Sequence, residues 1–146
     1  MEGRDAGREL STAVVAFHEA VGASLGVTAV DQRALAVIAG AGSVSAGELA
    51  KEIGLTPGAV TGVVDRLERA GLARRSPHPD DRRRLVITAV RGPFGDTFSG
   101  LSKAMGELTD RYSPAEQAVI ADWVARTVEV LREQTRILVE RDQRPS

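Results

Sequence analysis

Residues 45–71, SAGELAKEIGLTPGAVTGVVDRLERAG, contain the start signals of two short helices in direct succession. Ser45 followed three residues later by Glu48 is a capping box, in which each side chain accepts a backbone amide hydrogen that the start of a helix leaves unpaired. Thr56 and Pro57 give the second start signal, because threonine caps helix N-termini well and proline at the first helical position loses no hydrogen bond. The sequence therefore predicts two helices here, separated by a very short connection.

The connection between these helices has the residue types that a helix-turn-helix needs. Gly54 permits a tight turn, and the small side chain of Ala50 allows the two helices to cross closely. Apolar residues stand at the positions that would hold the pair together: Leu49, Ile53, Leu55, Val60 and Val63. Any two helices joined by a glycine satisfy part of this pattern, so the residues that follow decide its interpretation.

Two short strands are predicted after the second helix. Residues 72–76 and 85–88 have strand character, and the polar, turn-rich residues 77–83, PHPDDRR, lie between them. A helix-turn-helix followed by a hairpin with a basic tip is a winged helix-turn-helix. In this motif the second helix can enter the major groove of DNA, and the hairpin can place arginine in the neighbouring minor groove.

The charge of the chain is unevenly distributed. The 146 residues carry 19 basic and 20 acidic side chains, and the resulting net charge of −1 by itself argues against a nucleic-acid partner. Residues 56–91, however, contain eight arginines and four acidic residues, so this segment has a net charge of +4 and the rest of the chain −5. A cationic block on the predicted motif favours a nucleic-acid partner.

The composition excludes several other classes of function. The chain has no cysteine, which rules out disulfides, thiolate catalysis and cysteine zinc sites, and its two histidines, His18 and His78, are far apart. We find no nucleophile–base pair, glycine-rich phosphate loop or metal-ligand cluster, so we expect neither an enzyme nor a bound metal or cofactor. No apolar run approaches about 20 residues and the N-terminus lacks a signal-peptide core, so we expect a soluble cytoplasmic protein without membrane contact.

Helical periodicity also marks both ends of the chain. Apolar residues at spacings of three and four predict further helices over residues 6–25, 28–39, 93–112 and 115–140. We expect Gly40 and Gly42 to end the second of these, and Tyr112 and Trp123 to lie in the core. The first and last helices have broader apolar faces than a small winged lobe needs, which favours a homodimer.

The chain resembles the MarR family of bacterial transcriptional regulators. The resemblance is most specific over residues 45–90 and extends more loosely through helix order and the segment 108–116, LTDRYSPAE. The matching residues are Glu48-Leu49-Ala50, Val60-Thr61, Val64-Asp65-Arg66-Leu67-Glu68, Gly71-Leu72, Arg75 and Asp81-Arg82-Arg83. One departure is that Ala89-Val90 ends the hairpin, where the family usually has Leu-Thr.

The resemblance implies a mainly α-helical fold with a small β-hairpin wing, in a single domain over residues 1–146. Residues 28–92 would form the winged helix-turn-helix DNA-binding lobe, and residues 6–27 and 93–141 a helical dimerisation lobe. It also implies a homodimer that binds a pseudo-palindromic operator in double-stranded DNA, in many members as a repressor. Many members are released from DNA by small, often aromatic or phenolic ligands, and the sequence leaves open whether this chain binds such an effector and with which residues.

The candidate DNA-binding residues lie on the second helix of the motif and on the hairpin. They are Thr56, Pro57, Gly58, Thr61, Arg66, Arg74, Arg75, Arg82, Arg83 and Arg84. The exposed face of the helix is rich in small residues, so direct readout would rest on Thr61 and Arg66, and shape readout through the wing would carry more of the specificity. The family resemblance implies that Asp81 orients the wing through an ion pair with Arg83.

Several of these residues also have a purely structural interpretation. Arg66 could pair with a neighbouring acidic residue, Arg74 and Arg75 could be strand-surface residues, and residues 82–84 could form a solvated turn. His18 fits a helix surface or an interface better than a ligand sensor. For the protein as a whole, a winged domain that docks on another protein is the alternative to a sequence-specific DNA-binding regulator.

Overall fold

The computed structural model describes residues 3–142, and all of their side chains except those of Arg4, Pro93 and Phe94. Residues 1–2 and 143–146 of the predicted domain lie outside the described residues. The chain divides into two compact units, one that ends at Phe98 and one that begins at Ser99. The division into a DNA-binding lobe and a dimerisation lobe built from both chain ends stays a prediction.

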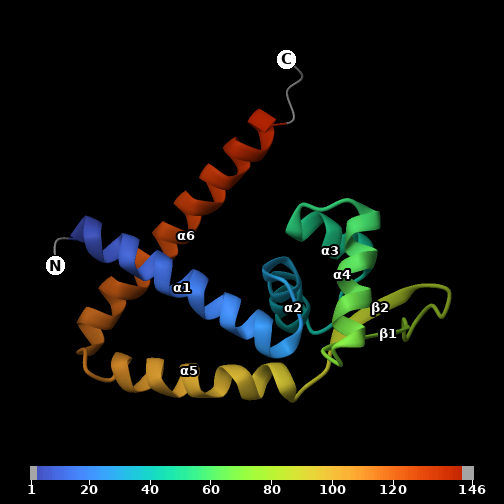
Figure 1. The fold of residues 1–146 in the computed structure, drawn as a ribbon, viewed down its shortest axis with the longest axis horizontal. Helices are drawn as coiled ribbons and strands as arrows, with labels where there is room; N and C mark the ends of the chain where they lie inside the picture. Colours follow the sequence, from blue (N-terminus) through green and yellow to red (C-terminus); the bar gives the residue numbers. More distant parts are fainter. Residues whose placement is uncertain (1–2, 143–146) are drawn as a thin grey trace. The chain divides into compact units, whose positions relative to one another are not determined.

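The chain is mainly helical, with one β-hairpin in the first unit (Figure 1). In chain order the elements are α1 (Gly3–Leu25), α2 (Ala29–Ala41), α3 (Ala46–Ile53), α4 (Pro57–Arg69), β1 (Ala73–Pro77), β2 (Leu85–Ala89), α5 (Pro93–Thr109) and α6 (Pro114–Asp142). The boundary between the two units falls within α5. The predicted fold class, a mainly α-helical chain with a small hairpin wing, is confirmed.

Local signals in the sequence determine where α3 and α4 begin. Ser45 Oγ accepts the amide of Glu48 at 3.1 Å, and the Glu48 carboxylate accepts the amide of Ser45 at 2.8 Å, so the predicted capping box is present. Thr56 caps α4 by accepting the amide of Ala59 at 3.2 Å. Gly54 ends α3 in the left-handed conformation, with φ 70° and ψ 34°, which glycine adopts at little cost.

Helix α2 is longer at its C-terminal end than the sequence pattern predicts. It continues through Gly40 to Ala41, and Gly42, with φ 78°, follows its last turn. The expectation that Gly40 takes part in ending the helix is therefore wrong. A glycine inside a helix costs about 1 kcal/mol relative to alanine, and the burial of Leu35 and Ile38 on this helix outweighs that cost.

An apolar core lies between α2, α3, α4 and the base of the hairpin. Its largest fully buried apolar side chains are Leu35, Ile38, Leu49, Val60, Val63, Val64, Leu67 and Leu72. The residues predicted to hold the helix-turn-helix together are all buried except Leu55, which packs against the core while partly exposed. Complete burial of a leucine or valine side chain contributes roughly 1.5–3 kcal/mol, so this core fixes α4 firmly on its scaffold.

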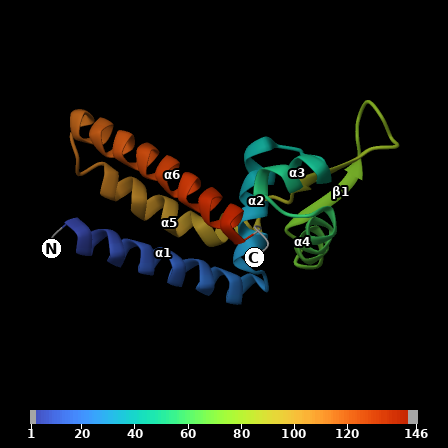
Figure 2. The same cartoon turned by 90° about the horizontal axis from the view of Figure 1, so that it is seen from above.

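The hairpin has a third, minor partner at its base. Strands β1 and β2 pair antiparallel, with Arg75 opposite Ile87. Val44, between α2 and α3, exchanges two backbone hydrogen bonds with Ile87, at 3.0 and 2.7 Å. Pairing over one residue leaves no pattern in the sequence, and it was not predicted. The base of the hairpin is thus anchored, while Figure 2 shows the loop between β1 and β2 extending beyond the helices of this unit.

Helix α6, in the second unit, has no buried residue in its described length. Its exposed large apolar side chains are Val119, Ile120, Trp123, Val124, Val128, Val130, Leu131, Leu138 and Val139. Trp123 is 57% exposed and Tyr112, just before the helix, is 42% exposed, so the expectation that both lie in the core is wrong. An apolar stripe at helical spacing indicates that a face is to be covered, but not that the same chain covers it.

Two other classes of site can be checked on the described residues. No single helix among them is long and apolar enough to cross a membrane. Helix α1 from Asp5 onward and α2 reach that length and composition only as a pair, with a bend of 88° between them. The described residues also contain no group of three or more histidine, aspartate or glutamate side chains placed to hold a metal ion.

Candidate nucleic-acid interface

Helix α4 has one buried face and one exposed face. The buried face consists of Val60, Val63, Val64 and Leu67. The exposed residues at its N-terminal end include all four of the predicted contacts there: Thr56, Pro57, Gly58 and Thr61. Their small side chains would allow the helix backbone to approach base edges closely and would suit contact with a thymine methyl group.

The N-terminal end of α4 also has favourable electrostatics for DNA. Pro57 has no amide hydrogen and Thr56 binds the Ala59 amide, so the Gly58 amide and the helix dipole supply the partial positive charge that attracts a phosphate. Further along the exposed face, the Thr61 hydroxyl donates to the carbonyl of Pro57 at 3.1 Å. Its oxygen retains lone pairs that can accept a hydrogen bond from a base.

Arg66, predicted to contact DNA or to pair with an acidic residue, is bound within the protein. Its Nε donates to both carboxylate oxygens of Asp31 on α2, at 3.1 and 3.2 Å, and its Nη2 donates to Oδ1 at 2.9 Å. Asp31 is fully buried, whereas the Arg66 side chain is 41% exposed.

The ionisation of this pair follows from its surroundings. Burial raises the pKa of Asp31, but hydrogen bonds from Arg66 and Thr28 outweigh that effect and hold the pKa below its usual value. The hydrogen bond to Asp31 in turn raises the pKa of Arg66. Both groups therefore stay charged. Of the two roles predicted for Arg66, pairing with an acidic residue is the one that its contacts in the structure match.

Arg75 on β1 is also turned toward carboxylates, in this case those of α4. Its Nη1 lies 2.9 Å from Asp65 Oδ1 and contacts Glu68 Oε1, and its Nη2 lies 3.5 Å from the Thr61 carbonyl oxygen. These contacts hold the base of the hairpin against α4. They occupy the guanidinium group that was predicted to contact a phosphate.

The tip of the hairpin carries three consecutive exposed arginines, Arg82, Arg83 and Arg84. In the part of the chain that the structure describes, no carboxylate pairs with their guanidinium groups. The expected ion pair between Asp81 and Arg83 is absent from the described residues, because Asp81 Oδ1 instead accepts the backbone amide of Arg83 at 3.1 Å. Aspartate commonly bonds the backbone two residues further on in a turn. Asp81 thus shapes the turn, and the Arg83 side chain forms no ion pair with a described carboxylate.

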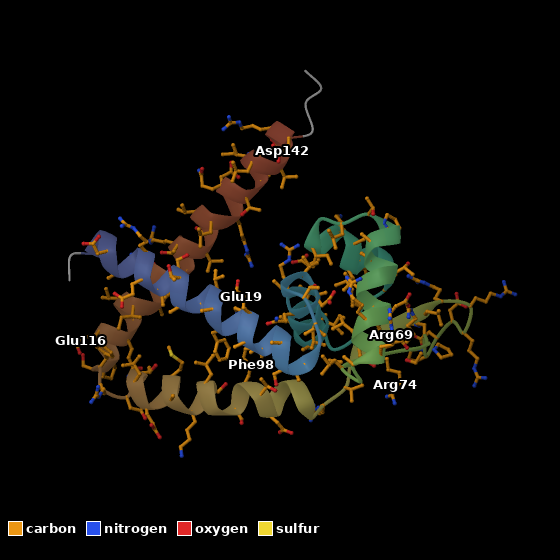
Figure 3. All side chains as sticks on the ribbon, in the orientation of Figure 1. Glu19, Arg69, Arg74, Phe98, Glu116 and Asp142 are labelled. Atoms are coloured by element: carbon orange, nitrogen blue, oxygen red, sulfur yellow. The ribbon has the colours of Figure 1, made fainter. Side chains whose placement is uncertain are left out.

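Arg74 completes the predicted set. It is exposed on β1, and because side chains alternate along a strand, it projects from the face opposite to that of Arg75. None of the ion pairs between described residues includes it. Figure 3 shows the Arg74 and Arg69 side chains on the part of this unit that carries β1 and α4.

The structure thus separates the predicted contacts into two groups. Thr56, Pro57, Gly58 and Thr61 share one exposed helix end, and Arg74 and the arginines from 82 to 84 form no ion pair with another described residue. Arg66 and Arg75, in contrast, hold α4 to its neighbours. Contact of each residue with DNA stays a prediction. Sequence reasoning missed Asp31 as the partner of Arg66, since the two are 35 residues apart and no local pattern connects them.

An apolar cavity of about 940 Å³ lies where α1 meets α2 in the first unit. Its lining includes the apolar residues Val14, Val15, Ala23, Val27 and Phe98. Two of its polar residues bind each other: His18 Nδ1 lies 2.8 Å from Gln32 Oε1, and Gln32 Nε2 donates to the His18 carbonyl at 2.8 Å. No spacing in the sequence predicts this cavity, because its walls come from separate segments of the chain.

Comparisons with known proteins agree with this architecture. The family model described as "MarR family" matches residues 25–84. YcgE of Bacillus subtilis (strain 168), which is named as an HTH-type transcriptional regulator, is 38% identical over 130 residues, or 87% of this chain and 84% of YcgE. The chain belongs to the MarR family. It is thus a winged-helix transcriptional regulator of a family that is generally non-enzymatic.

Solved structures share the fold of this MarR-family chain. A MarR-like transcriptional regulator from Thermotoga maritima is 24% identical, with a TM-score of 0.66, and the match covers 90% of this chain and 98% of that one. RV1404 from Mycobacterium tuberculosis is 24% identical, with a TM-score of 0.65 and coverage of 86% and 90%. FabT from Streptococcus pneumoniae, solved in complex with DNA, is 22% identical, with a TM-score of 0.62 and coverage of 90% and 98%. At these identities the similarity establishes the fold.

Proposed function

We propose that this MarR-family regulator is a homodimeric repressor that binds a pseudo-palindromic operator in double-stranded DNA. The observation that carries the proposal is the exposed N-terminal end of α4 together with a hairpin whose tip arginines, Arg82, Arg83 and Arg84, form no ion pair among the described residues. A helix of this kind fits the major groove, and cations at a hairpin tip fit the negative potential of a narrow minor groove. The DNA complex of FabT, a protein of the same fold, supports DNA as the partner class.

Each group of candidate residues has its own part in this proposal. Arg74 and the hairpin arginines would neutralise phosphates or enter the minor groove, which positions the protein without reading bases directly. Residues 56–58 would place the positive end of α4 near a phosphate, and Thr61 would contact a base edge. Arg66 and Arg75 would contribute by holding α4 and the hairpin in place.

The homodimer is supported by apolar side chains that the chain itself leaves exposed. They lie on α6 and also on α1, where Leu10, Val14 and Val15 are exposed. Extensive exposed apolar surface of this kind marks interaction sites. A second copy of the chain is the partner that fits a regulator of palindromic DNA. Twofold symmetry would place the two copies of α4 at half-sites about 34 Å apart.

The cavity between α1 and α2 is our candidate site for a small aromatic or phenolic effector. Its volume of about 940 Å³ falls within the roughly 300–1,000 Å³ that is usual for small-molecule sites. Its walls are mainly apolar, and the bonded pair His18 and Gln32 supplies polar atoms that a phenolic hydroxyl could bind. Such a ligand would release DNA only if it bound the DNA-incompetent state more tightly than the competent one.

The test of DNA binding is a gel-shift titration against the DNA upstream of the protein's own gene, at several salt concentrations. We expect a specific shift whose affinity falls steeply with salt, because each phosphate that an arginine neutralises contributes about 0.9 to the slope of log affinity against log salt. The double variant Arg82→Ala, Arg83→Ala should lower the affinity by about tenfold or more and reduce that slope.

The matched control is Arg111→Ala, which removes an exposed arginine that follows α5. This variant should keep the wild-type affinity and salt slope. Wild-type affinity in the double hairpin variant would refute the proposed role of the wing. The absence of any shift for the wild-type protein at low salt would favour the alternative, a winged domain that docks on another protein.

A further inference from the structure

Three consecutive polar side chains at the start of α2 bind three different helices. Asp31 accepts hydrogen bonds from Arg66 on α4, Gln32 bonds His18 on α1, and Arg33 donates to the carbonyl of Ile53, the last residue of α3, at 2.8 Å. Both Asp31 and Gln32 are buried. This turn of α2 therefore connects α4, α1 and α3 by polar contacts, and the Asp31–Arg66 pair joins α4 to α2 as the Arg75 contacts join α4 to the hairpin.

The contact between Asp31 and Arg66 differs in kind from the apolar packing around it. Two nitrogen atoms of one planar guanidinium group donate to a single buried carboxylate, at 2.9 to 3.2 Å. Such fork-shaped pairs have a defined geometry, so rotation or sliding of α4 would break at least one of the bonds. Apolar packing between α2 and α4 is not directional and tolerates small displacements better.

Asp31 is itself held in place. Its Oδ2 accepts the backbone amide of Thr28 at 2.9 Å, and its own amide donates to the Thr28 hydroxyl at 3.2 Å, in the capping box that begins α2. The acceptor for Arg66 is thus part of the backbone geometry of α2. Movement of α4 relative to α2 cannot be absorbed by a rotation of the Asp31 side chain without loss of these bonds.

We propose that Asp31 is a positioning residue for DNA recognition, which acts through Arg66 to set the presentation of α4 to the major groove. This inference rests on the proposed DNA-binding function. Base contacts depend on the placement of the helix, whereas attraction of the hairpin arginines to phosphates does not. Loss of the pair should therefore lower specific binding much more than non-specific binding.

The experiment compares Asp31→Asn and Arg66→Lys with the wild-type protein. Asparagine keeps the shape of Asp31 but places an amide donor against the guanidinium group, and lysine keeps the charge of Arg66 but lacks the fork. Affinity is measured for the upstream fragment that the wild-type protein binds and for an unrelated duplex of equal length, at a temperature where each variant is fully folded.

We expect each single variant to lose about tenfold or more in affinity for the specific fragment, comparable to the loss of one base contact. Affinity for the unrelated duplex and its salt slope should stay within about twofold of wild type. The double variant should be no worse than the more impaired single variant, because both changes break one contact. A merely structural defect would lower both affinities together.

Ser113→Ala is the matched control, since it removes a capping hydroxyl of the same kind at the start of α6, in the second unit, and leaves Asp31, its capping box and the Arg66 pair unchanged. It should retain the wild-type ratio of specific to non-specific affinity. Full specific affinity in Asp31→Asn, with a salt slope lowered by about one in Arg66→Gln, would overturn the proposal and identify Arg66 as a phosphate contact. If Asp31→Asn does not fold, Arg66→Lys and Arg66→Gln decide the question. Failure of the wild-type protein to bind any upstream DNA would instead refute the proposed function.

Discussion

Helix α4, in the first unit, buries its apolar face within that unit, whereas α6 leaves its apolar side chains exposed. Leu35 and Leu67 in the first unit are at most 1% exposed, but Leu131 and Leu138 on α6 are 61% and 59% exposed. All four belong to stripes at helical spacing. The comparison shows that one sequence pattern can lead either to a core within the chain or to a surface that requires a partner.

The ion pairs of the two regions differ in the same way. Asp31, the carboxylate that holds Arg66, is fully buried, and its partner is only partly exposed. On α6, the pairs of Arg136 with Glu133 and Glu140 connect side chains that are all more than half exposed. Exposed pairs are screened by water and salt and contribute little to stability. In the first unit, geometry is set by buried contacts, while α6 presents a charged and apolar surface.

The largest expected effect comes from breaking the apolar face of α6. We expect the double variant Trp123→Glu, Leu131→Glu to be monomeric, because it places two carboxylates on the surface that would bury against a second copy. Operator affinity should fall by about 100-fold or more, since binding of two half-sites by linked lobes becomes binding of one. Sedimentation and gel-shift titration measure the two effects.

The control for this prediction is Ala125→Glu, which adds a carboxylate to the same helix at an exposed position off the apolar stripe. It should remain dimeric and bind DNA like the wild type. A dimer that persists in the double variant at micromolar concentration would show that α6 does not form the interface.

The second prediction compares the same truncation in the two regions. Leu67→Ala should lower the free energy of unfolding by about 2–5 kcal/mol, because it removes fully buried methyl groups and leaves a cavity. Leu131→Ala should change the free energy of unfolding of the monomer by less than about 0.5 kcal/mol and weaken dimer association instead. Denaturant unfolding at a protein concentration where sedimentation finds monomer separates the two effects. Equal losses in the free energy of unfolding of the two monomeric variants would contradict the difference between the buried face of α4 and the exposed face of α6.

Features encoded by neighbouring residues could be predicted from the sequence. The capping box of Ser45 and Glu48, the cap of α4 at Thr56 and the turn at Gly54 each depend on residues within a few positions of one another, and all three are present. The periodicity of α3 and α4 also identified the buried face of the winged motif. Together these features were sufficient for the fold class.

Features that depend on distant residues could not be predicted in the same way. Asp31 and Arg66 are 35 residues apart, so the side chain predicted for DNA contact gave no indication of its buried partner. Val44 joins the hairpin through one residue, which leaves no alternation to detect. Trp123 was expected in the core because periodicity identifies an apolar face but not the surface that covers it.

The smallest expected effect concerns the pH dependence of stability, and it compares the two kinds of ion pair. The pKa of Asp31 is lower in the folded protein than its value of about 3.9 in an unfolded chain. A lowered pKa contributes stability above the unfolded value, and that contribution is lost as the pH falls through the folded value. Asp31→Asn should therefore lower the free energy of unfolding at pH 7 by about 1–3 kcal/mol and make it fall less steeply with acid below about pH 4.

The matched variant on α6 is Glu133→Gln. The hydrogen bond from Arg136 also lowers the pKa of Glu133, so the sign of the effect is the same. Its size should be smaller and should decrease further with added salt, because both side chains are more than half exposed to solvent. Denaturant unfolding of the three proteins from pH 7 to pH 3, at low and high salt, measures the difference. If the free energy of unfolding of Asp31→Asn fell with acid as steeply as that of the wild type, the pair of Asp31 and Arg66 would not determine the loss of stability below about pH 4. The ion pairs of the two regions would then not differ in their effect on the pH dependence of stability.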